Sequence, residues 1–366
     1  MSRHGSELRA PDAETGAKPR LNKWLKLALV GVVVLGLAVI GLRGRLPDPR
    51  EFFTALVGAE YAWVALAALL QAISILAFAF QQRRLLAALG VKLGYRNAVA
   101  ITLARAALSI SLPAGAAVAT GYAIREYRKA GASREVGAAS AIVSGLASIG
   151  GLTLLYVAGG AGIVARNPAA FLNWRPLAIV CGIAALTTLA ILLGRRQMNE
   201  PAPERRAPSG RVTRYLLGLL NSARDGWRAG AALRTRDWAA ALAYAAVNWL
   251  TDLLCLAAAT RALGLPVGVT TLAGIYLGVQ IVRQVPLTPG GVGVIETALV
   301  AGLTATGATA ISAAAAVLIY RLLSCWLIIP VGGIAAITLR RGLDTESRRG
   351  LDTQSRPPAD AAETVV

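Results

Sequence analysis

The chain has 366 residues, of which 55% are hydrophobic and only 16% are charged, and its mean hydropathy is +0.57. This composition is too apolar for a soluble domain, and several apolar runs approach the length that spans a bilayer. The net charge of +19 does not favour nucleic-acid binding, because the basic residues gather in short loops beside apolar runs, as on the cytoplasmic side of membrane proteins.

Metal and cofactor chemistry find no support in the sequence. The three cysteines, Cys181, Cys255 and Cys325, lie inside apolar runs, and the only histidine, His4, lies in the polar N-terminal tail. No G-x-x-x-x-G-K-[ST] motif and no cleavable signal peptide is apparent. We therefore expect no cofactor, no metal and no disulfide framework.

The predicted fold is an all-α polytopic membrane domain over residues 23–341, between disordered tails at 1–22 and 342–366. We expect about six full spans, at 25–42, 61–80, 136–164, 177–193, 238–259 and 311–338. An arginine-rich cytoplasmic loop, 195–237, separates two halves at about 59–164 and 238–339. Within it, 216–227 has apolar residues at helical spacing, which suits a helix on the inner membrane surface or a solvated linker helix.

Two further apolar segments are broken by proline and glycine. The first, 98–122, breaks at Pro113 and Gly115, and the second, 270–306, breaks over residues 286–293. Broken backbone at membrane depth persists only inside protein or beside a polar cavity. We predict two helical hairpins at these places, and the charges of the loops permit either re-entrant or fully spanning ones.

The two breaks have similar sequence contexts. An offset of 176 or 174 residues superposes three pairs of segments, namely 113–115 on 289–291, 131–133 on 307–309, and 89–90 on 263–264. The loop charges open the first hairpin to the cytoplasm and the second to the outside, which is the pattern of an inverted repeat. The alternative is chance similarity between alanine-rich helices.

Polar side chains at helical spacing mark faces that should turn towards the interior of the bundle. The stripes are Asn248, Thr251, Asp252 and Cys255; Tyr276, Gln280, Arg283 and Gln284; Thr102, Arg105 and Ser109; and Arg321 with Ser324. Glu296 and Arg321 could form a structural ion pair, contact a substrate, or do both. Arg283 could also snorkel from the outer end of its segment.

Pro286-x-Thr-Pro-Gly-Gly-x-Gly-x-x-Glu296, followed by Leu318-Ile-Tyr-Arg321-Leu, resembles the membrane domain of bacterial lysylphosphatidylglycerol synthases and their stand-alone flippase-like relatives. The Leu-Pro-x-Gly break at 112–115, with Tyr122 and Arg125, matches that family's first motif more loosely. The resemblance implies movement of a lipid between leaflets, with Pro289, Gly290, Gly291, Glu296 and Arg321 as the functional core. Ala114, Ala116 and Thr120 replace basic and acidic residues of many relatives, and the soluble aminoacyl-transferase domain is not recognisable after Arg341.

These observations predict a lipid translocase with a polar groove between the repeat halves, in the bacterial plasma membrane with both termini cytoplasmic. The predicted substrate-binding residues are Pro289, Gly290, Gly291, Gly293, Glu296, Arg321, Asp252, Arg283, Thr288, Arg105, Pro113, Gly115 and Tyr122. The expected partners are membrane lipids, a second copy of the chain, or a separate lipid-modifying enzyme. The alternatives are a membrane transferase acting on a lipid-linked substrate, a small-solute transporter, and a scaffold with structural charge pairs.

Overall fold

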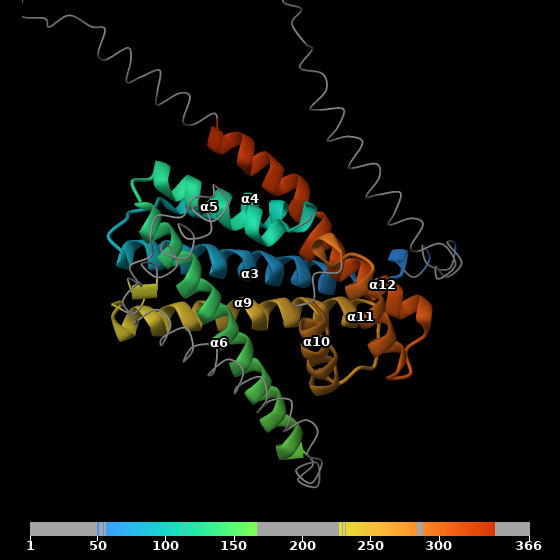
Figure 1. Ribbon diagram of the computed structural model, residues 1–366. Helices are drawn as coiled ribbons and strands as arrows, with labels where there is room; N and C mark the ends of the chain where they lie inside the picture. Colours follow the sequence, from blue (N-terminus) through green and yellow to red (C-terminus); the bar gives the residue numbers. More distant parts are fainter. Residues whose placement is uncertain are drawn as a thin grey trace, which may run out of the picture. The chain divides into compact units, whose positions relative to one another are not determined.

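The computed structural model describes residues 50, 54, 56–112, 114–166, 227–228, 230, 232–283 and 288–340, which all belong to the second of two compact units, Pro47–Val366. Every regular element in this part of the chain is a helix (Figure 1). The predicted spans 25–42 and 177–193, both tails, Pro113 and nearly all of the arginine-rich loop lie outside the described residues.

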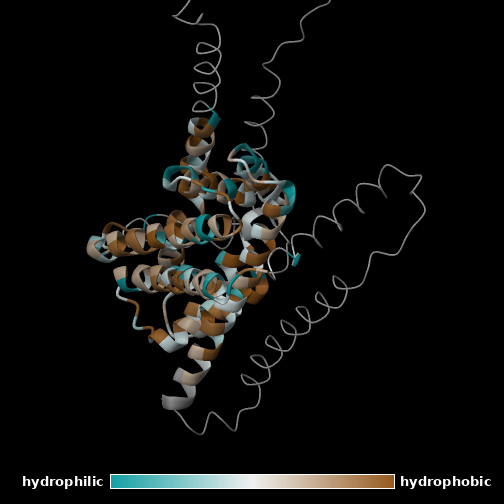
Figure 2. Cartoon of the chain, turned by 90° about the vertical axis from the view of Figure 1, so that its left-hand side faces the viewer, coloured by the Kyte–Doolittle hydropathy of each residue, from teal (hydrophilic) through white to brown (hydrophobic). Residues whose placement is uncertain are grey.

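Four helices in the described part are long and apolar enough to cross a bilayer, and they confirm four of the predicted spans. They are α3 (Tyr61–Ala88), α6 (Arg134–Arg166), α9 (Thr235–Ala262) and a helix over Ala310–Arg340 that contains α12 (Ala310–Arg321) and the π-helical η3 (Leu322–Trp326). Much of the helical ribbon is coloured as hydrophobic (Figure 2). The chain is therefore a polytopic all-α membrane protein.

The two predicted hairpins are present, and each is broken where proline and glycine occur. The first consists of α4 (Tyr95–Ser111) and α5 (Gly115–Lys129); the second consists of α10 (Val269–Arg283), the 3₁₀ turn η2 (Pro289–Gly291) and α11 (Val294–Thr304). The arms have 11 to 17 residues. At 1.5 Å per residue they span roughly 17 to 26 Å, less than the ~30 Å hydrocarbon core, which favours re-entrant hairpins.

The order of the helices confirms the internal repeat. α3 and α9 begin 174 residues apart (61 to 235), as do α4 and α10 (95 to 269), whereas α6 and α12 begin 176 apart (134 to 310). Left-handed backbone conformations recur at the same offsets. The pairs are Gly90 (φ 87°) with Gly264 (φ 65°), Ala114 (φ 53°) with Gly290 (φ 61°), and Gly131 (φ 89°) with Gly307 (φ 95°). A chance similarity between alanine-rich helices would not place both the helix starts and the left-handed turns at the same offsets. The two halves therefore share a structural repeat.

The two halves are inverted relative to each other. The N–H of Glu60, before α3, donates to the carbonyl of Ala262 at the end of α9 (2.8 Å), while Arg84 near the end of α3 pairs with Asp237 in the first turn of α9 (2.8 Å). α3 and α9 are therefore antiparallel neighbours (Figure 1). Between them Ser74 donates to the carbonyl (3.1 Å) and the side-chain oxygen (3.2 Å) of Asn248, its own counterpart 174 residues later. This contact places the pseudo-twofold axis between the two helices.

The inversion makes the hairpins open at opposite ends of the α3–α9 pair and brings their breaks together. The first hairpin starts after the end of α3, and the second starts after the end of α9. A Cβ built on Gly290 would lie 2.9 Å from Cγ2 of Ile110, near the end of α4. Only glycine permits so close an approach, so the second break rests directly on the tip of the first hairpin.

Candidate functional site

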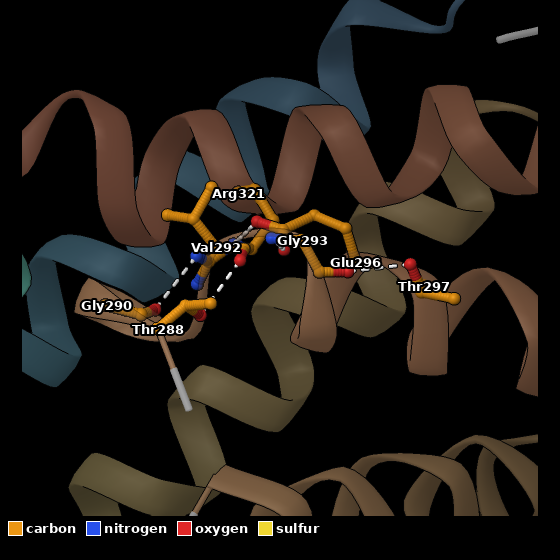
Figure 3. A network of polar contacts seen from close by, with 7 residues as sticks. All are labelled: Thr288, Gly290, Val292, Gly293, Glu296, Thr297 and Arg321. Atoms are coloured by element: carbon orange, nitrogen blue, oxygen red, sulfur yellow. Dashed lines mark hydrogen bonds and ion pairs between the residues drawn. The ribbon is translucent and has the colours of Figure 1, made fainter. Parts of the chain in front are cut away.

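An ion pair between Glu296 and Arg321 spans the second break (Figure 3). The Arg321 Nε donates to Glu296 Oε1 (2.5 Å), and its Nη2 donates to the carbonyl of Gly290 (3.2 Å). The Arg321 side chain is 4% exposed and the Glu296 side chain 22%. The guanidinium thus joins α12 to the break itself and to α11 behind it, so the predicted ion pair is present.

Local hydrogen bonds shape the break so that it presents these groups. Gly293 adopts φ 85° before α11, and its N–H donates to Glu296 Oε2 (2.7 Å), which caps the helix and fixes the carboxylate. Thr288 Oγ1 donates to the carbonyl of Val292 (2.9 Å), and Thr297 Oγ1 donates to that of Gly293 (2.7 Å). The break is therefore a defined structure, and one oxygen of Glu296 remains for Arg321.

A second buried acid lies beside this pair. Tyr276 of α10 and Tyr320 of α12 both donate their hydroxyl groups to Oδ2 of Asp252 in α9, at 2.6 and 3.0 Å. All three residues are buried. Because Tyr320 and Arg321 are adjacent, α12 connects the acid of α9 with the acid of α11. The predicted inward stripe on α9 is confirmed, since Thr251, Asp252 and Cys255 are buried and Asn248 accepts from Ser74.

A small cavity lies beside the two tyrosines and Arg321. Its polar lining comes from Tyr276, Gln280, Arg283, Tyr320 and Arg321, so the predicted stripe on α10 faces the site. The Gln280 side-chain oxygen is buried and has no hydrogen-bond partner. The cavity offers only about 10 Å³ to the centre of a water molecule, room for about one water. This cavity is too small to be the open groove that we predicted between the repeat halves.

Arg283 does not lie where snorkelling from the outer end would place it. It is the last residue of α10, and α10 begins beside the end of α9 and runs towards the break. The exposed Arg283 side chain therefore lies at the tip of the second hairpin, where it lines the same cavity as Arg321.

The predicted site residues of the first half do not join this cluster. The guanidinium carbon of Arg105 lies 5.0 Å from the ring centroid of Phe78, and no carboxylate contacts it within the described residues. Tyr122 stacks under Arg125 at 5.3 Å. Gly115 is structural, because an added Cβ would lie 2.3 Å from the carbonyl oxygen of Ser109. The link between the two breaks is the contact of Ile110 with Gly290.

Polar residues of α3 were missed in the sequence. Gln71, Ser74, Gln81 and Gln82 are all buried on this helix. Gln82 donates to Ser144 and accepts from Ser140 (3.2 Å) and Tyr127 (3.4 Å), and thereby joins α3 to α5 and α6. Gln71 lies three residues before Ser74, and Gln81 and Gln82 lie seven and eight residues after it, which is helical spacing. Neutral glutamines in an apolar run nevertheless attract less notice than charges.

The described residues contain no group of three or more histidine, cysteine or acidic side chains that could hold a metal ion. Comparison with protein families finds a match over residues 24–332 to the model described as the lysylphosphatidylglycerol synthase TM region. Comparison with curated proteins finds no match.

Proposed function

This chain belongs to the lysylphosphatidylglycerol synthase transmembrane family, and from that premise we propose that it is a lipid translocase of the bacterial plasma membrane, with both termini in the cytoplasm. Its substrate is a lipid with an anionic, aminoacylated or polyprenyl-linked headgroup. The observation that carries the proposal is the ion pair of partly buried Glu296 with buried Arg321 at a glycine-rich break, where two oppositely opening hairpins meet. Charges at membrane depth persist where they are paired, and they mark substrate pathways.

The chemistry of the break suits a phosphate-bearing headgroup. A guanidinium has five N–H donors, and the contacts of Arg321 with described residues occupy only Nε and Nη2. The first turn of α11 adds backbone N–H groups and the positive end of a helix dipole. Glu296 offers a carboxylate to the cationic part of an aminoacylated headgroup. The same pair thus holds the break together and supplies recognition.

The cavity beside Arg321 leaves no room for a substrate. A cavity with room for about one water cannot admit a lipid headgroup, so transport requires the second hairpin to separate from α12. Two features next to the site suit such a movement: the glycines of the break, and the π-helical segment that follows Arg321, where the Leu327 N–H bonds the carbonyl of Leu322 five residues earlier. The acyl chains stay in hydrocarbon while the headgroup passes.

In this proposal the chain performs no covalent chemistry. A gradient, the distribution of the lipid itself, or a separate lipid-modifying enzyme that supplies it on one side would drive net movement. A second copy of the chain is a further possible partner.

The test is reconstitution into liposomes that carry a fluorescent anionic lipid in both leaflets, with dithionite added outside to bleach the accessible fraction. Wild type should carry the fluorescent lipid of the inner leaflet to the outer leaflet, where dithionite bleaches it. Glu296→Gln and Arg321→Ala should slow this second phase of bleaching. Asp237→Asn is the matched control, since it also removes a buried carboxylate from an ion pair, with the partly exposed Arg84, but away from the breaks.

Equal rates for wild type and both site variants, in folded protein, contradict the site assignment. Slowing by Asp237→Asn to the same degree means that the loss reflects stability alone. No exchange of any lipid, together with turnover of a lipid-linked sugar, would replace the translocase by a membrane transferase.

A further inference from the structure

A second cavity lies at the opposite end of α4 from the breaks. It has a volume of about 730 Å³, within the range of small-ligand sites. Its walls come from the loop between α3 and α4, the first turns of α4, the end of α5 and the end of the last helix. Arg96 and Ile110 are fourteen residues apart on α4, which places the cavity about 21 Å from the break.

The charged side chains that line this cavity are mainly positive, and two of them have no partner among the described residues. Lys92 and Arg96 line it, and neither has a hydrogen-bond or ion-pair partner in the described part of the chain. The single acid, Glu126, is already neutralised: it is 5% exposed, and it pairs with Lys129 (2.8 Å) and Arg125 (3.1 Å). The cavity therefore presents two free cations without an opposing free carboxylate.

Backbone donors point to the same kind of ligand. α4 begins at the cavity, and its first-turn N–H groups have no acceptor within the helix. Gly94, the residue before the helix, has no side chain to cap them. An anion placed there meets N–H groups, two cationic side chains and the positive end of a 17-residue helix.

The cavity wall is fixed before any ligand arrives. Arg83 donates to the carbonyl of Leu93 (3.1 Å) and lies 3.7 Å from the ring centroid of Tyr95, and the N–H of Val91 donates to the carbonyl of Leu86 (2.8 Å). These contacts hold the loop between α3 and α4 against both helices. A preformed site loses less entropy on binding.

We propose that this cavity binds the phosphate of an anionic membrane lipid, such as phosphatidylglycerol, at a site separate from Glu296 and Arg321. The position favours a lipid over a soluble anion. The cavity lies among helix ends rich in lysine and arginine, where membrane proteins meet headgroups. Leu93, Ile101 and Leu339 supply apolar walls for the start of the acyl chains. The proposal goes beyond translocation and does not depend on it.

The test uses full-length protein in detergent, with an environment-sensitive dye on Thr338→Cys at the rim of the cavity. The background carries Cys181→Ser, and Cys255 and Cys325 are buried, which limits labelling to the introduced thiol. Short-chain phosphatidylglycerol is titrated at physiological ionic strength. Short-chain phosphatidylcholine and inorganic phosphate serve as competitors.

Lys92→Ala combined with Arg96→Ala should weaken binding about thirtyfold, roughly fivefold for each cation. The matched control, Arg128→Ala with Arg134→Ala, removes the same charge from exposed positions that do not line the cavity. It should stay within about threefold, since exposed charges that do not line the cavity act on a bound anion only through solvent that screens them.

Equal losses in the two double variants would reduce the effect to general surface charge and overturn the site. No loss in the Lys92 and Arg96 variant would overturn it as well. Competition by inorganic phosphate as effective as that of the lipid would assign the cavity to a soluble anion instead. Because the dye reports only this cavity, an absence of lipid transport in liposomes leaves the binding result unchanged.

Discussion

The ion pair across the second break makes a quantitative prediction about stability. In the variant Glu296→Gln, the guanidinium of Arg321 stays 4% exposed with only neutral acceptors, the Gly290 carbonyl and the new amide. Removing one partner of a buried pair costs about 3–5 kcal/mol, and we expect a loss of about 3 because the amide oxygen still accepts a hydrogen bond.

The partner variant Arg321→Met should cost less. Glu296 is 22% exposed and keeps the hydrogen bond from the Gly293 N–H, so its charge is still partly satisfied and the expected loss is about 2 kcal/mol. The double variant contains no uncompensated buried charge. It should lose only about 2–3 kcal/mol, which implies a coupling energy of about 2–3 kcal/mol between the two positions.

Two buried cysteines supply the assay. Cys255 and Cys325 are inaccessible in the folded protein, so a thiol-reactive dye reports unfolding on heating in detergent, in a Cys181→Ser background. Each single variant should unfold at a lower temperature than wild type, and the double variant should unfold above the temperature that the summed shifts predict. If the shifts simply add, Glu296 and Arg321 do not depend on each other, and the assignment of the pair as the lock of the break is wrong.

Three further changes test the packing around the breaks with the same unfolding measurement. Gly332→Ala should cost about 2 kcal/mol or more, since an added Cβ would lie 2.3 Å from a carbonyl oxygen of α4. In the control Gly333→Ala, the added Cβ meets nothing within 4 Å, so this variant should be neutral or stabilising. Equal effects of the two substitutions would contradict the close contact. Ala114→Gly should stabilise by about 1 kcal/mol because Ala114 has φ 53°, and a loss of stability would refute the strained turn. Tyr276→Phe should cost about 1–3 kcal/mol by removing a donor from buried Asp252, and an unchanged midpoint would contradict that bond.

The breaks and the repeat could be predicted because they depend on local chemistry. Proline at 113 and 286–289 removes backbone donors and the glycines beside it admit positive φ, which favours a break, and the turns at Gly90 and Gly264 need a residue that tolerates positive φ. Such signals are readable from a few residues. The sequence offsets of 174 and 176 then reappear as the spacing of the helix starts.

The partners of the charged side chains could be predicted only in part. Glu296 and Arg321 are ionisable groups in apolar runs that need partners, which made their pairing a reasonable prediction. The third member, the carbonyl of Gly290, becomes available only when the break folds against α12. The closed state of the cavity likewise depends on how α10, α11 and α12 pack, and no short stretch of sequence encodes that.

Neutral buried polar groups were harder to predict than charges. Ser74 looked unremarkable in the sequence, yet it bonds Asn248 across the pseudo-twofold axis. Gln82 ties three helices together although no charge draws attention to it. A repeat offset of 174 does relate Ser74 to Asn248, so an inverted repeat identified in a sequence also indicates which residues to examine as pairs at the axis.

The two halves share the same arrangement of helices, but their polar residues differ, and these two properties have different consequences. Repeat symmetry supplies two hairpins that open at opposite ends and meet at their breaks. The proposed translocation path needs such an arrangement, because the lipid must reach it from both leaflets. The charged residues Asp252, Glu296 and Arg321 have no charged counterparts at these offsets in the first half. The counterparts of Asp252, Tyr276 and Tyr320 at those offsets are Phe78, Thr102 and Ser144, and Phe78 contacts a cation through its ring rather than through a carboxylate. If both halves bound the headgroup equally, the lipid would have two equivalent resting places, whereas a single charged centre at the contact of the two breaks gives it one. In the proposed translocase, the asymmetry therefore favours one substrate site that is reached alternately from the two leaflets.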